Sequence, residues 1–555
     1  FANKLLVLID GRSAFSQLYD GVFWETTDLP LEDVERIEVI RGPGGTMWGA
    51  NAVNGVINII TTHSRESQGT LISMTGESVG PGGQATLRQG WRLGETGGLR
   101  VYGKAFDRTL TNGPAIHDRW ALGRAGFRAD GGTAEHGFSV QGSAYDGKFG
   151  QTYALLPGLT TQDQTVGDSD VHGGQISGAV TRGGNARSLL TVRSFLDYTY
   201  RKELLLNERR LNADVDLQHR VAVRTRHDVI WGAGYRRTND DVIGSAFASF
   251  SPQKRGADLF SVFAQDEITL APALHLTAGT KFEHSTLSGG GWQPSARAIW
   301  NINASHAVWG AVSRALRTPS RAELDVTVVV MQLPPSALAP LPTQVVREAA
   351  PGLKPEILWA YEGGYRGRFG DRVSIDFATF VNDYSKLSQS TLGLPSLRVG
   401  AAGPFIYQPL NQVGNSTALT RGVEAALEWR PMSHVRASGA YTYLYSNEAD
   451  SGDIGTLLTG RDPAHLLTAR AQLDLPYGLE VDPTVRAVSR LQDRSVDGYT
   501  ALDLHVSRRF SRALEVALIG HNLVGANRVE FKQGVANTVP SMVQRAVMAS
   551  ANWRF

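Results

Sequence analysis

Hydrophobic and polar residues alternate one by one along most of the chain after Thr70. The segment RVSIDFATFVND (372–383) is typical, with apolar side chains at every second position from Val373 to Phe377. Such alternation gives a β-strand one apolar face and one polar face. Segments of about 10 residues can cross a bilayer as tilted strands. Since no run of 18 or more apolar residues occurs, no transmembrane helix is expected.

The links between these segments carry further information. About 22 alternating segments follow one another between Thr70 and Phe555, and short and long links alternate between them. The short links are 94–97, 130–135, 271–272, 303–305, 370–371, 430–433, 476–478 and 511–512, and the long links are 148–172, 238–256, 317–357, 385–418, 446–464 and 524–543. Tight turns on one side and long loops on the other are typical of an outer-membrane barrel. A series of soluble β-sandwiches is the alternative, but no linker recurs after residue 70.

The first 65 residues have a different pattern. NKLLVLIDGRS (3–13) and GVINIITT (55–62) are short apolar strands, and LEDVERIEVIRG (31–42) is an acidic turn that leads into a strand. This mixed segment is too small for a large core of its own, and a barrel of about 22 strands has a plugged lumen. The predicted fold is therefore an all-β, 22-stranded antiparallel outer-membrane barrel (67–555) with a partial α/β plug (1–66).

Composition excludes several functions. Lys and Arg number 55 and Asp and Glu 53, so the net charge of +2 gives no reason to expect a nucleic-acid partner. The absence of cysteine excludes disulfides and thiolate metal sites. No HExxH motif, nucleophile elbow on a strand-to-helix turn or catalytic carboxylate pair is recognised, so neither an enzyme nor a cofactor is predicted. The acidic stretches TNDD (238–241) and SNEADSGD (446–453) lack EF-hand spacing, which favours solvated loop charge over calcium binding.

The glycine-rich stretch RGPGGTMWG (41–49) invites comparison with nucleotide-binding loops. It lacks the Lys-Ser/Thr pair of a P-loop and the glycine spacing of a dinucleotide fingerprint. Glycine permits positive φ and close backbone approach. We therefore expect this stretch to bring the plug close to the barrel wall.

Two stretches point to a known family. VLIDGR (7–12) and PLEDVERIEVIRGPGGTMWGANAVNGVINIITT (30–62) resemble the second half of the plug domain of TonB-dependent outer-membrane receptors. Similar blocks occur at 315–324, 353–366 and 420–431 and in the terminal NWRF. The resemblance implies a monomeric receptor in the outer membrane of a Gram-negative bacterium, powered by the TonB–ExbB–ExbD complex. It also implies that the chain starts inside the plug, without the upstream TonB box.

The resemblance implies import of a scarce nutrient, most commonly a ferric siderophore. Cobalamin is the alternative ligand within the family, because a barrel of fewer than 500 residues is short for a TonB-dependent receptor. A passive porin or an adhesin is the alternative from another class, and the plug argues against an open pore.

Aromatic residues mark a candidate ligand-binding loop. By resemblance, the loop after LIDGR rises toward the outside and contacts the ligand, and aromatic side chains give large contact areas for this task. Packing against the barrel wall is an equal alternative. An arginine beside the loop would attract an anionic ferric chelate. The candidate residues are Arg12, Phe15, Tyr19, Phe23 and Trp24.

Two glutamates are candidates for contact with the plug. Alternation places Glu362 on the face opposite Tyr361, inside the lumen, and Glu424 also faces inward. A carboxylate in a plugged lumen needs a charged or hydrogen-bonded partner. By resemblance, Arg41 pairs with Glu362 and Glu424. This cluster has one excess negative charge, which Arg36 or backbone N–H groups would help to balance. The alternative is that these side chains simply face water.

Overall fold

The computed structural model describes residues 3–79, 82–109, 117–154, 164–185, 187–336, 339–448, 462–491, 496–525, 527–530 and 542–555. Parts of the long links 148–172, 446–464 and 524–543 therefore lie outside the described residues, as does most of the acidic stretch 446–453. No helix among the described residues has the length and apolar character needed to cross a bilayer.

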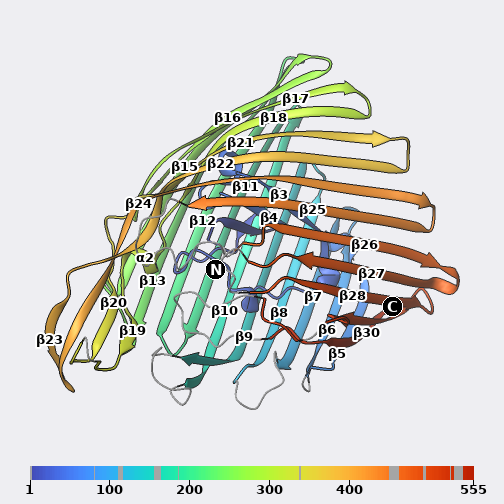
Figure 1. The fold of residues 1–555 in the computed structure, drawn as a ribbon. Helices are drawn as coiled ribbons and strands as arrows, with labels where there is room; N and C mark the ends of the chain where they lie inside the picture. Colours follow the sequence, from blue (N-terminus) through green and yellow to red (C-terminus); the bar gives the residue numbers. More distant parts are fainter. Residues whose placement is uncertain are drawn as a thin grey trace.

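Within the described residues, 22 long antiparallel strands close into a barrel, as the alternation predicted (Figure 1). The wall strands are β5 (Gly69–Glu77), β6 (Gly82–Leu93), β7 (Gly97–Thr109), β8 (Arg119–Gly132), β9 (His136–Ala154), β10 (Gln164–Asn185), β11 (Ser188–Lys202), β12 (Leu206–Val223), β13 (His227–Gly244), β15 (Lys254–Ala271), β16 (Leu274–Ser285), β17 (Gly289–Asn303), β18 (His306–Arg317), β21 (Glu356–Phe369), β22 (Val373–Leu392), β24 (Gly403–Met432), β25 (Val435–Glu448), β26 (His465–Leu475), β27 (Leu479–Val488), β28 (Tyr499–Arg509), β29 (Leu514–His521) and β30 (Ala546–Arg554).

The barrel closes between the last strand and the first. β30 pairs with β5 in antiparallel register, with Trp553 opposite Ile72. Closure leaves no free sheet edge, so the backbone N–H and C=O groups of the wall are satisfied within the wall. On β21, Tyr361 is 54% exposed on the outer face, whereas Ala360 is fully buried on the inner face. The predicted alternation of outer and inner positions is confirmed on this strand.

The short predicted links are turns between wall strands. Residues 370–372 join β21 to β22, and the predicted link 476–478 is the 3-10 turn η5 (Pro476–Gly478). The long loops carry extra elements: β14 (Ala248–Phe250), α2 (Arg321–Leu324), β19 (Val326–Leu333), β20 (Thr343–Arg347) and β23 (Ser396–Gly400). β20 pairs in parallel with β24, which extends the sheet beyond the barrel at the end opposite the short turns (Figure 1).

A small four-stranded sheet lies inside the barrel, and Figure 1 shows β3 and β4 within the wall. Its order is β2-β1-β4-β3, with β1 parallel to β4. Its strands are β1 (Leu5–Ile9), β2 (Arg12–Ser13), β3 (Val34–Arg41) and β4 (Gly55–Thr61), accompanied by η1 (Trp24–Thr26), η2 (Leu31–Asp33) and α1 (Gly45–Trp48). We call residues 3–66 the plug. The chain enters the wall through η3 (Ser64–Glu66), which precedes β5.

The plug has a core of its own, but a small one. The apolar run LLVLI of β1 is almost fully buried. It packs in a cluster of five buried residues with partly buried neighbours from β3 and α1. The buried members are Leu6, Leu8, Phe15, Ala52 and Val56. So small a core leaves the position of the plug dependent on its contacts with the wall.

Candidate functional site

The glycine-rich stretch brings the plug against the wall. Gly42 has a φ of +76°, and a Cβ added there would overlap the Glu362 carboxylate. Gly49 has a φ of +89°, and a Cβ added there would overlap the carboxylate of Glu283 of β16. Between them, the Thr46 hydroxyl donates a hydrogen bond of 2.8 Å to the Gln293 carbonyl of β17. The prediction that these glycines allow close approach of plug and wall is confirmed.

At the start of this stretch, Arg41 forms an ion pair with Glu424 of β24. The arginine side chain is 59% exposed and the glutamate side chain 22% exposed. Glu362 lies against the Gly42 backbone instead, and no ion pair between Glu362 and Arg41 is found among the described residues. Arg297 of β17 is a cation that interacts electrostatically with the Glu362 carboxylate.

Arg36 does not contribute to this contact within the described part of the chain. It pairs with Glu35 and with Glu38, at 2.8 Å for the latter, on an exposed face of the plug. Residues two apart on a strand share a face, so Arg36 and Glu38 meet within β3. The structure thus joins Arg41 to Glu424 but leaves Arg36 paired within the plug.

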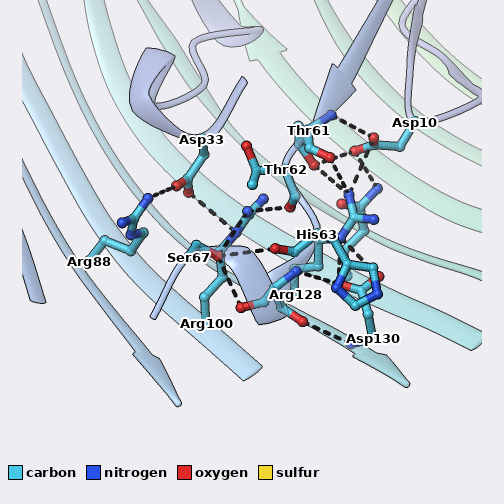
Figure 2. Close-up of polar contacts among 12 residues, drawn as sticks. Asp10, Asp33, Thr61, Thr62, His63, Ser67, Arg88, Arg100, Arg128 and Asp130 are labelled. Carbon is cyan, nitrogen blue, oxygen red and sulfur yellow. Dashed lines mark hydrogen bonds and ion pairs between the residues drawn. The ribbon is translucent and has the colours of Figure 1, made fainter. Parts of the chain in front are cut away.

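The more deeply buried contacts join plug acids to wall bases (Figure 2). Asp33 is 2% exposed and lies 2.7 Å from Arg88 of β6 and 3.4 Å from Arg100 of β7. Asp10 lies 3.4 Å from Arg128 of β8 and accepts a hydrogen bond of 2.9 Å from the Thr61 backbone N–H. Buried charges persist only when paired and hydrogen-bonded, so these pairs fix the position of the plug.

Acidic residues of the plug also pair with basic residues at other positions around the wall. Asp28 pairs with Lys104 at 2.7 Å, and Asp20 pairs with Arg317 at 2.8 Å. Glu25 pairs with Arg201, 2.5 Å away. Sequence reasoning missed these contacts. The signal that could have found them is the series of basic residues at inward positions of three consecutive strands, namely Arg88, Arg100, Lys104, Arg124 and Arg128.

Helix α2 covers the outer loop of the plug. The backbone N–H groups of Arg321 and Ala322 donate hydrogen bonds of 2.9 Å to the carbonyls of Gln17 and Leu18. Leu18 and Ala322 belong to one buried apolar cluster, completed by Leu206, Val242, Ala248, Phe250 and Val326. The part of loop 317–357 that carries α2 therefore contacts the plug and covers it on the side opposite the short turns.

An ion network fastens this cover. Arg317 contacts Asp20 of the plug, Glu323 of α2 and Glu356 of β21. Glu323 also completes the capping box of α2 with Ser320. Burial raises the pKa of Glu323, but the hydrogen bonds and charge of Arg317 outweigh it and leave the pKa below its usual value of 4.5.

The five candidate ligand residues differ in exposure. Phe15 is buried in the plug core, and Arg12 pairs with Asp197 of β11 at 3.0 Å. The Arg201 guanidinium lies 3.9 Å above the ring of Phe23, and Tyr19 packs on the cluster beneath α2. Trp24 is 53% exposed. Four of the five residues pack against the wall or within the plug.

The described residues hold no group of three or more His, Asp or Glu side chains arranged for a metal ion. In the acidic stretch 238–241, Asp240 pairs with Arg321, and Asp241 lies 3.7 Å from Lys254. These carboxylates are engaged by cations of the protein. Within the residues that the structure describes, the plugged barrel therefore has no group of side chains arranged to bind a metal ion.

Comparison with known families decides the identity. The family model described as "TonB dependent receptor-like, beta-barrel" matches residues 72–523, and "TonB-dependent Receptor Plug Domain" matches residues 1–56. The chain belongs to the TonB-dependent receptors. It is accordingly an outer-membrane protein, as the sequence predicted.

Individual TonB-dependent receptors agree with this assignment. The chain is 26% identical over 491 residues to the iron-regulated outer membrane virulence protein of Vibrio cholerae, covering 84% of this chain and 72% of the relative. It is 24% identical over 533 residues to the ferric enterobactin receptor of Pseudomonas aeruginosa, covering 81% and 70%. The crystal structure of the siderophore receptor PirA from Acinetobacter baumannii shares the fold, with a TM-score of 0.77 at 16% identity and coverage of 100% and 91%.

Proposed function

We propose that this TonB-dependent receptor captures a ferric siderophore outside the cell and imports it to the periplasm. The relative named a ferric enterobactin receptor, similar over 81% of this chain, supports this ligand class. We further propose that the chain acts as a monomer with the TonB–ExbB–ExbD complex and is not an enzyme. The plug would comprise residues 1–66 and the barrel residues 67–555.

The buried ion pairs between plug and wall carry the proposal of gated import. A lumen filled by a plug that Asp33, Asp10 and Asp20 fasten to the wall does not suit a passive pore. Passage of a large ligand requires these pairs to break. Because each buried charge is costly when left alone, release needs an energy input, which the TonB complex would supply.

We propose Trp24 as the ligand contact of the plug, because it is the exposed member of the aromatic set. Arg12, Phe15, Tyr19 and Phe23 would hold the loop in place beneath it through the contacts described above. Arg41 and Glu424, with Glu362 against the adjacent glycine, would hold the plug to the opposite part of the wall.

Binding to the purified full chain tests the ligand class. Ferric enterobactin and other ferric siderophores should quench tryptophan fluorescence in a saturable way, whereas cyanocobalamin should not. Trp24→Ala should weaken binding. Trp91→Ala should leave it unchanged, because Trp91 is 45% exposed on the outer wall. Saturable binding of cyanocobalamin alone would replace the siderophore assignment, and steady ion conduction in planar bilayers would favour a pore.

A further inference from the structure

A cavity of about 90 Å³ lies between the plug and the wall strands β7 to β12. It is larger than the roughly 10–15 Å³ that one water molecule requires. Five guanidinium groups line it, from Arg12, Arg100, Arg124, Arg128 and Arg210. Arg12, Phe15 and Phe23 of the loop beneath Trp24 also line the cavity, but Arg124 has no role in the ligand capture proposed above.

Arg124 differs from the other four arginines. It is 8% exposed, and among the described residues no carboxylate lies within ion-pair distance of it. Its guanidinium donates to the Ser143 hydroxyl at 2.9 Å and to the Thr26 carbonyl, and its Nε has no hydrogen-bond partner. A buried cation without a counter-charge is strongly unfavourable.

The charges around the cavity leave one positive charge unmatched. The set considered is the charged lining residues together with their ion-pair partners. The cations are Arg12, Arg88, Arg100, Arg124, Arg128 and Arg210, and the carboxylates are Asp10, Asp33, Asp130, Asp197 and Glu208. One carboxylate is lacking in this set, and Arg124 is the arginine without one.

We propose that this cavity binds a small monovalent anion, of the halide class, beside Arg124. Arg124 of the wall and Arg12 of the plug both line this cavity. An anion between them therefore joins plug and wall. A multiply charged oxyanion is disfavoured, because Asp10, Asp33 and Asp197 line the same space.

Bromide is the probe, because its anomalous scattering distinguishes it from water. Crystals of the full chain soaked in bromide should show an anomalous peak in the cavity beside Arg124. The peak should be lost in Arg124→Gln and kept in Arg436→Gln, which removes an exposed arginine of β25. Absence of the peak in the unaltered protein would mean that the cavity holds water only, and would overturn the proposal.

A solution measurement keeps the test independent of crystals. At constant ionic strength, replacing gluconate by chloride should slow proteolysis of the plug by the factor 1 + [chloride]/Kd. Arg124→Gln should abolish this dependence, and Arg436→Gln should retain it. Equal chloride dependence in Arg124→Gln and the unaltered protein would place the anion elsewhere and refute the assignment.

Discussion

Replacement of Asp33 by alanine should loosen the plug far more than replacement of Arg41. Asp33→Ala removes a side chain that is 3% exposed and leaves Arg88 and Arg100 facing each other without their shared carboxylate. Removing one partner of a buried ion pair costs about 3–5 kcal/mol. Since about 1.4 kcal/mol is a factor of ten, the population of loosened plug should rise by roughly 10²-fold to a few thousand-fold.

The matched variant is Arg41→Ala. The Arg41 side chain is 59% exposed, and exposed ion pairs contribute about 0–1 kcal/mol. Loosening should therefore rise less than about tenfold. The pairing of Arg41 with Glu424, expected from sequence, therefore contributes less than the buried pairs of Asp33. Heat resistance of the barrel should stay unchanged in both variants, because the closed hydrogen-bond ladder holds the wall.

Proteolysis of the plug and ion leakage across planar bilayers measure the effect on the full chain. The double variant Asp33→Ala with Arg88→Leu should recover part of the loss, because one of the two unpaired cations is gone. Equal loosening in Asp33→Ala and Arg41→Ala would refute the reasoning from burial. Loss of barrel heat resistance in Asp33→Ala would show that the plug contact supports the wall as well.

Three further predictions concern the plug contact, the wall and the cover. Gly42→Ala should loosen the plug more than Gly289→Ala, since both glycines have a φ near +78° but only Gly42 has a neighbour in the way; plug proteolysis checks this, and equal effects would point to backbone strain alone. Ile375→Arg on the outer face of β22 should cost more barrel stability than Ser374→Arg, although less than the roughly 2–4 kcal/mol of a midplane position because Ile375 lies near the strand end, as measured by unfolding in denaturant; equal costs would mean a register error of one residue. Because the pKa of Glu323 is lowered, its ion pair stabilises the cover above pH 4.5, and this stabilisation is lost as the pH falls through the lowered value; protection of the α2 amides against hydrogen exchange, corrected for the intrinsic rate, should therefore fall in acid, and unchanged protection would contradict the ion network.

The barrel was predictable because alternation is a local property of each strand. The contact of Gly42 and Gly49 with the wall was also predictable. Their stretch has no nucleotide-binding motif, so close approach to the wall remained as the explanation for its glycines. The pairing of Asp33 with Arg88 was not, because it joins residues 55 positions apart through the placement of the plug in the lumen. In sequence, an inward arginine on a wall strand looks the same whether it faces water or a buried carboxylate.

The aromatic loop shows the same limit. Phe15, Tyr19 and Phe23 were recognised as a group, but sequence left open whether they face ligand or wall. Tyr19 packs on the cluster beneath α2, which comes from a loop about 300 residues later in the chain, and Phe23 lies beneath Arg201 of the wall. Charge balance made Arg36 a candidate for the wall contact, yet the two-residue period of β3 pairs it with Glu38. Local periodicity was the better guide at that position.

The parallel pairing of β1 with β4 determines how the plug responds to a mechanical pull. The two strands start at the same end, with Leu5 opposite Gly55, and finish together at Ile9 and Ile59. A force on the chain ahead of Leu5 draws β1 from its starting end, while η3 holds β4 to the wall from its finishing end. The load therefore runs along the strands in shear and is shared by the whole ladder, so the sheet resists and then ruptures in one step instead of unzipping bond by bond.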